Sequence, residues 1–334
     1  MEIWILIGAL FVVLGGAECF TNALEHLGER LGISEGVTGS VFAAVGTALP
    51  EAMVPVIAVL ASSGSLQTRE EVGVGAILGA PLMLSTLSLS LMGYFAARKR
   101  GWSGPFHPEP TGLRRDLQWF LGAFSCGALA VFVPSDWKLA RTVLVLFLVL
   151  LYFGYLLVTI RASRNLVAEG HGTEADHPLY VSRIGIPTNL VTILLQLGVG
   201  LGLIIAGAKG FVYGVEHLAA WVGLSALALS LLIVPIATEL PEKVNSILWI
   251  RRGRDTLAFG NITGAMVFQG SLLPALGILL TPWAPRWEVL VGMGLTLTAT
   301  TYLYVVMLKG QIKPYHLLVN GLCYFLFVVS VMIF

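Results

Sequence analysis

Two stretches of the sequence, AVGTALPEAM at residues 44–53 and PIATELPEKV at residues 235–244, decide the fold. Each lies inside an apolar run that is long enough to cross a membrane, and each contains Leu-Pro-Glu. A carboxylate at this depth costs free energy unless it is paired, protonated or bound to a metal ion. A proline removes one helical hydrogen bond and leaves a carbonyl oxygen without its donor. Both oddities are explained if the two stretches surround an ion.

The composition predicts an integral membrane protein embedded in the lipid bilayer. The chain has 334 residues, of which 56% are hydrophobic and only 12% are charged. Soluble globular domains carry about 25% charged residues, so this chain has too few to cover a surface that faces water. The net charge of +1, without a basic and aromatic patch, indicates no nucleic-acid partner. The three cysteines form no Cys-x-x-Cys pair and are interpreted as small apolar residues.

Apolar runs of about 20 residues predict membrane-spanning helices. We expect about ten of them, at residues 3–23, 37–61, 72–97, 117–133, 141–160, 187–212, 224–249, 256–280, 287–308 and 315–334. The first run lacks a basic n-region and contains Glu18, so we expect a membrane helix there rather than a signal peptide.

The basic residues between these runs predict the orientation, because cytoplasmic loops are enriched in Lys and Arg. Alternate connections form two sets, and fourteen basic residues fall in the first: Arg30, Arg98, Lys99, Arg100, Arg114, Arg115, Arg161, Arg164, Arg183, Arg251, Arg252, Arg254, Lys309 and Lys313. Only four fall in the second: Arg69, Lys138, Arg141 and Arg286. The first set is therefore expected in the cytoplasm, with both termini outside the plasma (inner) membrane.

The chain contains an internal repeat. Residues 15–51 align without a gap with residues 206–242, at an offset of 191, and the alignment matches threonines, prolines and glutamates as well as apolar residues. Such a match predicts two related halves. Each half holds five expected spans, an odd number, so the second half enters the membrane from the opposite side, as in many secondary transporters. The expected units are a first repeat at 1–162, a cytoplasmic linker at 163–186 and a second repeat at 187–334.

The repeated motif supplies candidate ion ligands. Glu51 brings a negative charge, and Thr47 lies one helical turn before it, on the same face. Thr238 and Glu242 repeat this arrangement in the second half. Hard cations such as calcium and sodium take carboxylate, hydroxyl and carbonyl oxygens as ligands. For one motif alone, a helix kink at the proline and a glutamate that reaches toward the interface are the alternative; two copies in register favour an ion site.

These motifs resemble those of the cation/calcium exchanger superfamily, which includes the sodium/calcium exchangers. The residues that carry the resemblance are GTALPE and ATELPE, followed one helix later by GAILGAPLML at 75–84 and GNITGAMVFQ at 260–269. The resemblance covers essentially the whole chain. It implies an all-α membrane protein with two inverted five-helix repeats, in which Glu51 and Glu242 are the central ion-binding glutamates.

The resemblance also implies further ligands. The motif threonines correspond to Thr47 and Thr238, and the backbone carbonyl before each threonine belongs to Ala44 or Pro235. The Asn or Asp of the second element becomes Gln269 in the second half. Several other family positions have lost their side-chain oxygen, namely Ala48, Ala80, Leu84 and Ala265. Some of the sodium sites implied by the resemblance are therefore expected to be missing.

Glu239 departs from the family pattern, since it replaces the serine that follows the motif threonine. Two carboxylates at a spacing of three residues meet on one helix face, and in a medium of low dielectric constant they tend to share a proton. This arrangement favours proton coupling. In the alternative, Glu239 points away from the ion, because adjacent residues of a helix diverge by about 100°.

The leading hypothesis is a secondary active antiporter that exchanges calcium or another divalent cation for protons or sodium by alternating access. The alternative is a channel-like or non-transporting member with a degraded ion site. The sequence contains no HExxH, GxSxG or phosphate-loop motif, so no enzyme activity and no cofactor beyond the transported cations are expected. The sequence does not indicate which ion is carried or the oligomeric state.

Overall fold

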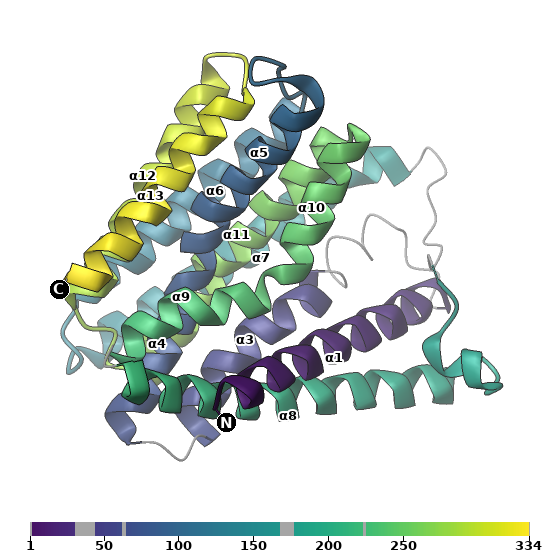
Figure 1. The fold of residues 1–334 in the computed structure, drawn as a ribbon, viewed down its shortest axis with the longest axis horizontal. Coiled ribbons are helices and arrows are strands. Elements are labelled where there is room, and N and C mark those ends of the chain that lie inside the picture. Colours follow the sequence, from purple (N-terminus) through teal and green to yellow (C-terminus); the bar gives the residue numbers. More distant parts are fainter. Residues whose placement is uncertain (1, 31–43, 62–64, 168–176, 223–224, 334) are drawn as a thin grey trace.

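The computed structural model describes residues 2–30, 44–61, 65–167, 177–222 and 225–333, which are helical and contain no strand (Figure 1). The α-helices are α1 (Glu2–Arg30), α3 (Ala44–Ala61), α4 (Leu66–Met83), α5 (Leu89–Arg100), α6 (Pro110–Leu129), α7 (Lys138–Val167), α8 (Leu190–Val222), α9 (Ala226–Thr238), α10 (Leu240–Arg252), α11 (Asp255–Leu280), α12 (Trp287–Leu308) and α13 (Pro314–Ile333). A π-helical turn, Leu84–Ser88, joins α4 to α5, and 3-10 turns occupy Ala130–Phe132 and Tyr180–Ile184.

Seven helical segments in the described ranges are long and apolar enough to cross a membrane. They are Trp4–Leu24, Leu66–Arg100, Lys138–Arg161, Leu190–Val215, Asp255–Leu280, Trp287–Leu308 and Pro314–Ile333. Two shorter apolar segments, Glu51–Leu60 and Ala226–Ile236, carry the repeated motif or precede it. The chain is therefore a multi-pass integral membrane protein.

The helices differ strongly in how deeply they lie within the protein. Of an 18-residue apolar stretch within the rod from Leu66 to Arg100, 94% is buried, whereas only 17% of such a stretch between Lys138 and Arg161 is buried. The second segment exposes large apolar side chains such as Leu139 and Phe147. Such exposure suits contact with lipid tails, which are as apolar as the side chains. The central rod consequently forms the scaffold on which the neighbouring helices pack.

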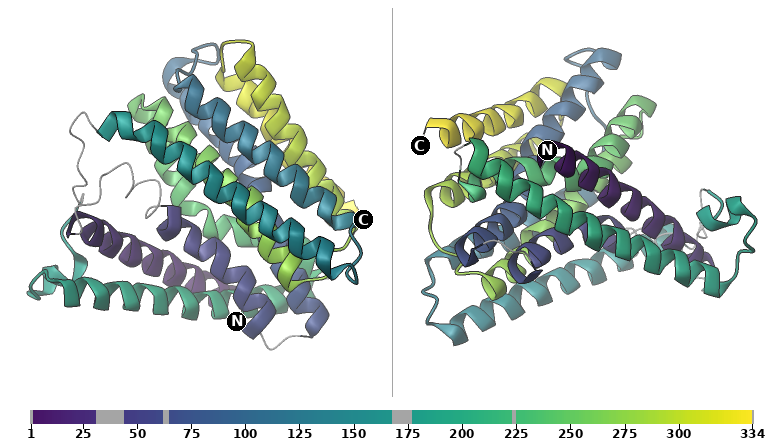
Figure 2. Two further views of the ribbon diagram at one scale, coloured as in Figure 1. Left: turned by 180° about the vertical axis from the view of Figure 1, so that it is seen from behind. Right: turned by 60° about the horizontal axis from the view of Figure 1, so that its bottom comes forward.

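Helices α1 and α8 lie side by side and run in opposite directions (Figures 1 and 2). Their contact depends on glycines that allow the two backbones to approach. A Cβ atom on Gly16 would lie 2.9 Å from the amide nitrogen of Ile204, and one on Gly207 would lie 2.8 Å from that of Val13. Gly16 and Gly207 occupy matching positions of the internal repeat.

The proline of the motif predicts an interruption in each half, and in the second half the structure divides the expected span at 224–249 into α9 and α10 at Glu239. Figure 1 shows the sharp bend between them. Pro241 lies in the first turn of α10, where a missing amide hydrogen costs no helical hydrogen bond. In the first half the expected interruption is not seen, since α3 continues through Pro50 to Ala61. Residues 37–43 of the corresponding expected span lie outside the described ranges.

Helices α4 and α9 pack against each other beside this bend. Pro235 lies inside α9 and has no amide hydrogen to donate to the carbonyl of Leu231. A Cβ atom on Gly79 would lie 2.5 Å from that carbonyl oxygen and 2.5 Å from Cγ of Pro235. Gly79 is therefore required for the close approach of the two helices.

Glu109 fixes the start of α6. Its carboxylate accepts hydrogen bonds from the amides of Thr111, at 2.8 Å, and Gly112, at 2.6 Å. Partial burial opposes ionisation, but these hydrogen bonds outweigh it and lower the pKa of Glu109. An ionised carboxylate at this position satisfies amides that have no partner within the helix.

Candidate functional site

Three buried glutamates converge where α3 meets the bend between α9 and α10. Glu51 comes from α3, Glu239 forms the bend, and Glu242 lies in the first turn of α10. One carboxylate oxygen from each lies within 4.8 Å of those from the other two. The exposed fractions of these residues are 3%, 0% and 2%, respectively. We call Glu51, Glu239 and Glu242 the carboxylate cluster.

The bend brings Glu239 into the cluster. Its backbone angles, φ −90° and ψ 3°, lie outside the regular helical region, and it ends α9 and begins α10. The alternative in which Glu239 points away from Glu242 is therefore not what the structure shows. The sequence had left both orientations open, because a proline two residues later disturbs the helical geometry.

Gln269 links Glu51, from the first half of the chain, to Glu239, from the second half. Its amide nitrogen, Nε2, donates hydrogen bonds to Oε2 of Glu51 at 2.9 Å and to Oε1 of Glu239 at 3.0 Å. The residue lies on α11 and is fully buried. One side-chain amide thus holds two carboxylates from separate helices in a fixed relative position.

Several oxygens of this site have no hydrogen-bond donor. They are Oε1 of Glu51, Oε2 of Glu239 and Oε1 of Gln269. Buried polar atoms in proteins are almost always paired, and those without a partner call for an explanation. Closely spaced carboxylate and amide oxygens are the ligands that hard cations take. The arrangement suits a cation that is carried as substrate and binds between the helices.

The other predicted ligands are Thr238, Thr47 and Ala44, and no contact between them and the carboxylate cluster is described. Thr238 is buried in the last turn of α9, where its hydroxyl donates to the carbonyl of Val234 at 3.3 Å. Ala44 begins α3, and Thr47 lies in its first turn. The side chains of Ala44 and Thr47 lie outside the part of the chain that the structure describes.

Three of the positions that lack the side-chain oxygen of the family motif lie in or against the apolar core. Ala80 and Leu84 are buried on the central rod, and Ala265 packs on the apolar core. Leu84 begins the π-helical turn, a feature often found at functional sites. These side chains supply packing in place of cation ligands.

The structure places two residues beside the cluster that the sequence did not predict as ion ligands, namely Lys243 and Asn261, of which Asn261 corresponds to an asparagine of the family's second element. Lys243 falls inside an apolar run of the sequence and is buried next to Glu242. Asn261 donates to the backbone carbonyl of Glu242 at 3.1 Å and to Oγ of Ser246 at 3.0 Å. Asn261 therefore ties the start of α10 to α11. A charged residue directly after the motif glutamate was the signal that pointed to Lys243.

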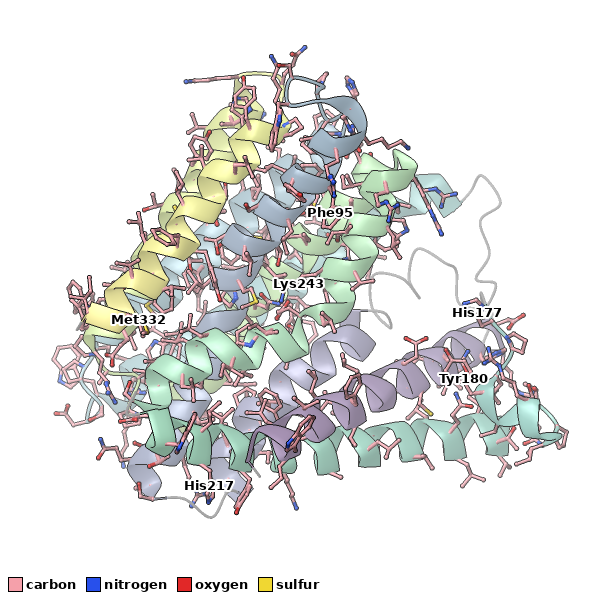
Figure 3. The ribbon with its side chains drawn as sticks, in the orientation of Figure 1. Phe95, His177, Tyr180, His217, Lys243 and Met332 are labelled. Atoms are coloured by element: carbon pink, nitrogen blue, oxygen red, sulfur yellow. The ribbon has the colours of Figure 1, made fainter. Side chains whose placement is uncertain are left out.

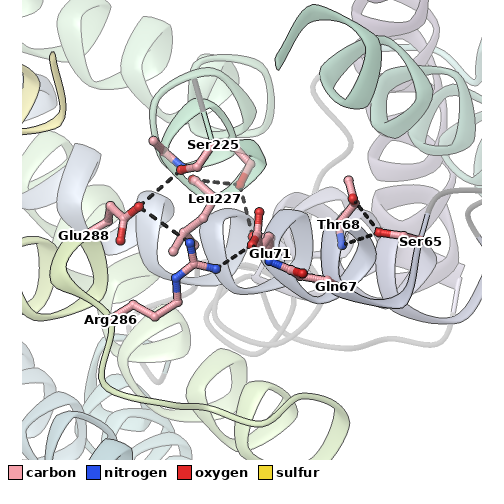
Figure 4. A network of polar contacts seen from close by, with 10 residues as sticks. Ser65, Gln67, Thr68, Glu71, Ser225, Leu227, Arg286 and Glu288 are labelled. Atoms are coloured by element: carbon pink, nitrogen blue, oxygen red, sulfur yellow. Dashed lines mark hydrogen bonds and ion pairs between the residues drawn. The ribbon is translucent and has the colours of Figure 1, made fainter. Parts of the chain in front are cut away.

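A second polar network lies at the starts of α4, α9 and α12 (Figure 4). Arg286 contacts Glu71 at 2.5 Å and Glu288 at 3.7 Å, and Ser225 donates to Glu288 at 3.2 Å. The hydroxyl of Ser225 also caps α9 by accepting from the amide of Ala228. Networked ion pairs hold elements together better than isolated surface pairs do. This network links three helix starts that are far apart in sequence.

Comparisons with known proteins agree with this architecture. Residues 1–161 and 192–333 match the profile of the family described as sodium/calcium exchanger protein. The inner membrane protein YrbG of Escherichia coli K12 is 29% identical over 280 residues, which cover 83% of this chain and 79% of YrbG. The putative antiporter CaxA of Alkalimonas amylolytica is 28% identical over 283 residues, or 84% and 81% of the two chains.

Among solved structures, the H⁺/Ca²⁺ exchanger CAX has a similar fold, with a TM-score of 0.74. The alignment covers 99% of this chain and 82% of that one, at 17% sequence identity. At this level of identity the similarity establishes the helical fold.

Proposed function

The chain belongs to the sodium/calcium exchanger protein family, and from this premise we propose that it is a secondary active cation antiporter. It exchanges calcium or another divalent cation for protons or sodium. The observation that carries this proposal is the buried carboxylate cluster, whose oxygens lie within 4.8 Å of one another. The names of the relatives CaxA and CAX support the same class of activity.

The charges around the site support exchange of one divalent cation for two monovalent ions. Three ionised carboxylates and the ammonium group of Lys243 together carry two negative charges. Buried charges are tolerated when they are compensated nearby. One divalent cation neutralises the site, and so do two protons or two sodium ions. The site is therefore suited to hold either kind of cargo, but not both together.

We further propose that alternating access arises from two inverted five-helix repeats, at 1–162 and 187–334, that move against each other about the cluster. The antiparallel pairing of α1 with α8 supports this reading, as does the matching of Gly16 with Gly207 at their contact. The distribution of basic residues supports termini on the outer side of the membrane. The binding residues in this scheme are Glu51, Glu239, Glu242 and Gln269, with oxygens from Thr47, Thr238 and the backbone carbonyl of Ala44.

The test is uptake of radioactive Ca²⁺ into liposomes that contain the purified protein, with sodium, potassium and proton gradients imposed separately. We expect uptake only when an opposing sodium or proton gradient is present. Glu51→Gln and Glu242→Gln should each abolish it, because each keeps the side-chain volume but removes one negative charge. Glu29→Gln is the matched control, since Glu29 is exposed near the end of α1.

Two results would contradict the proposal. Uptake that needs no opposing gradient would indicate a channel instead of an antiporter. Normal exchange by both cluster variants would place the ion site elsewhere in the protein.

A further inference from the structure

Lys243 is a buried cation that the proposed exchange does not by itself explain. It lies in the first turn of α10, directly after Glu242, and is 7% exposed. Figure 3 shows it near the centre of the molecule. Lysine is almost never buried unless it is paired, so the surroundings of its ammonium group determine its role.

The ammonium group of Lys243 donates a hydrogen bond to a backbone carbonyl oxygen next to the cluster. Nζ of Lys243 donates to the backbone carbonyl of Pro235 at 3.0 Å and lies 2.8 Å from Sδ of Met83. The Pro235 carbonyl also accepts from the amide of Glu239 at 3.1 Å. Carbonyl oxygens beside carboxylates are typical ligands of hard cations. In this protein the side chain of Lys243 forms a hydrogen bond with the Pro235 carbonyl, which is an oxygen of this kind.

Lys243 directly follows Glu242, and its ammonium group shares the Pro235 carbonyl with the amide of Glu239. It therefore brings one positive charge of the chain next to the carboxylate cluster. A sodium ion placed between the Pro235 carbonyl and the carboxylates would carry the same charge and meet the same carbonyl oxygen. The lysine differs from such an ion in one respect, which is that it cannot leave the protein.

The two halves of the internal repeat differ at this position. The offset of 191 residues matches Lys243 with Ala52, and Pro235 with Ala44. Ala52 has no donor group and no charge. Only the second half thus carries a cation of its own beside the repeated motif.

We propose that the ammonium group of Lys243 is a tethered cation that takes the place of one monovalent ion in the transport site. This inference rests on the proposed function. With the lysine present, the site carries two negative charges and is neutralised by one divalent cation or two monovalent ions. Without the lysine, it carries three negative charges, so that three monovalent ions neutralise it, whereas one divalent cation leaves one negative charge. Because the two kinds of cargo do not bind together, the variant exchanges one more monovalent ion for each divalent cation. Lys243 thereby sets the number of ions that are exchanged.

The test compares wild-type protein with Lys243→Ala, which removes the charge and opens space at the Pro235 carbonyl. Liposomes are held at zero membrane voltage with a sodium gradient of about tenfold and equal pH on both sides, and Ca²⁺ accumulation is measured at equilibrium. A tenfold gradient supplies about 1.4 kcal/mol for each monovalent ion moved. One additional coupled sodium ion should therefore raise the accumulation ratio by about tenfold over wild type.

Two further variants separate charge from space. Lys243→Met removes the charge but keeps most of the side-chain volume, so we expect uptake to fall without any gain in coupling. Lys209→Ala removes an exposed lysine from α8 and is the matched control, with coupling expected to equal that of wild type. Sodium should also raise the unfolding temperature of detergent-solubilised Lys243→Ala more than that of wild type, because the variant binds one more ion.

The outcomes distinguish this inference from the proposed function. Wild-type protein that moves no Ca²⁺ under any gradient would overturn the proposed function, and sodium-dependent stabilisation of Lys243→Ala would still support a tethered cation. Equal accumulation ratios for wild type and Lys243→Ala, together with equal stabilisation by sodium, would overturn the inference. If Lys243→Ala does not fold, a gain in coupling by Lys243→Met would overturn it, because methionine leaves no room for an ion.

Discussion

Replacing Glu239 with glutamine should change how transport responds to pH. The variant keeps the side-chain volume and an oxygen that still accepts from Gln269, but it removes one of three negative charges. Two unit charges about 4.8 Å apart interact by about 3.5 kcal/mol at an effective dielectric constant of about 20. This repulsion favours a proton in the cluster when the cation leaves. Glu51 and Glu242 should therefore hold protons less tightly in the variant.

The magnitude follows from the same repulsion. A free energy of about 1.4 kcal/mol moves a proton-binding equilibrium by one pH unit. Loss of one such repulsion therefore moves proton binding to the cluster by about 2.5 pH units before the protein relaxes. We expect the pH at which protons suppress Ca²⁺ uptake to fall by about two units in Glu239→Gln. Glu239→Ser, which restores the residue type of the family motif, should weaken the pH dependence or move the coupling toward sodium.

The assay is a pH-jump measurement of Ca²⁺ flux in liposomes for wild type, Glu239→Gln and Glu239→Ser. Glu29→Gln serves as the control for loss of a carboxylate outside the cluster. If wild type and both Glu239 variants give identical pH profiles, with sodium alone driving all three, protons are not exchanged at this site. Glu239 would then have a structural role at the bend between α9 and α10.

Other expectations concern the supports of the site. Thr238→Ala should slow Ca²⁺ flux by less than about tenfold, equivalent to about 1.4 kcal/mol, because a hydroxyl is at most one neutral ligand. Gly79→Ala should lower the unfolding temperature in detergent, because its Cβ would lie 2.5 Å from the carbonyl oxygen of Leu231 and overpacking costs about 1–3 kcal/mol. Gly122→Ala is the matched control, since a Cβ there meets nothing within 4 Å. Glu109→Ala should destabilise the protein by about 1 kcal/mol through loss of a helix cap. The pKa of Glu109 is lowered in the folded protein, so its contribution is present at neutral pH and is lost as the pH falls through that value.

Each expectation has a result that would contradict it. Complete loss of flux in folded Thr238→Ala would make its hydroxyl an essential ligand. Equal unfolding temperatures for Gly79→Ala and Gly122→Ala would show that α4 and α9 separate at no cost. A stability difference between wild type and Glu109→Ala that persists unchanged in acid would rule out the charged cap.

The sequence by itself determined the class of protein and the centre of the site. Apolar runs of membrane length can be read from the order of residues along the chain, because lipid requires a continuous apolar helix surface. The repeated Leu-Pro-Glu placed Glu51 and Glu242 at equivalent positions of two related segments. The structure brings these two carboxylates together, as the repeat had predicted.

Tertiary structure decided which other residues reach that centre. An apolar run does not reveal where a helix bends, so the division at Glu239 and the direction of its carboxylate followed only from the packed helices. Gln269 contacts Glu51 across 218 residues of chain, and Lys243 contacts Met83 across 160. Contacts of this kind depend on how α3, α4, α10 and α11 pack in space. Local sequence patterns do not encode that packing, because each helix satisfies its own backbone hydrogen bonds and leaves the choice of neighbours to side-chain fit.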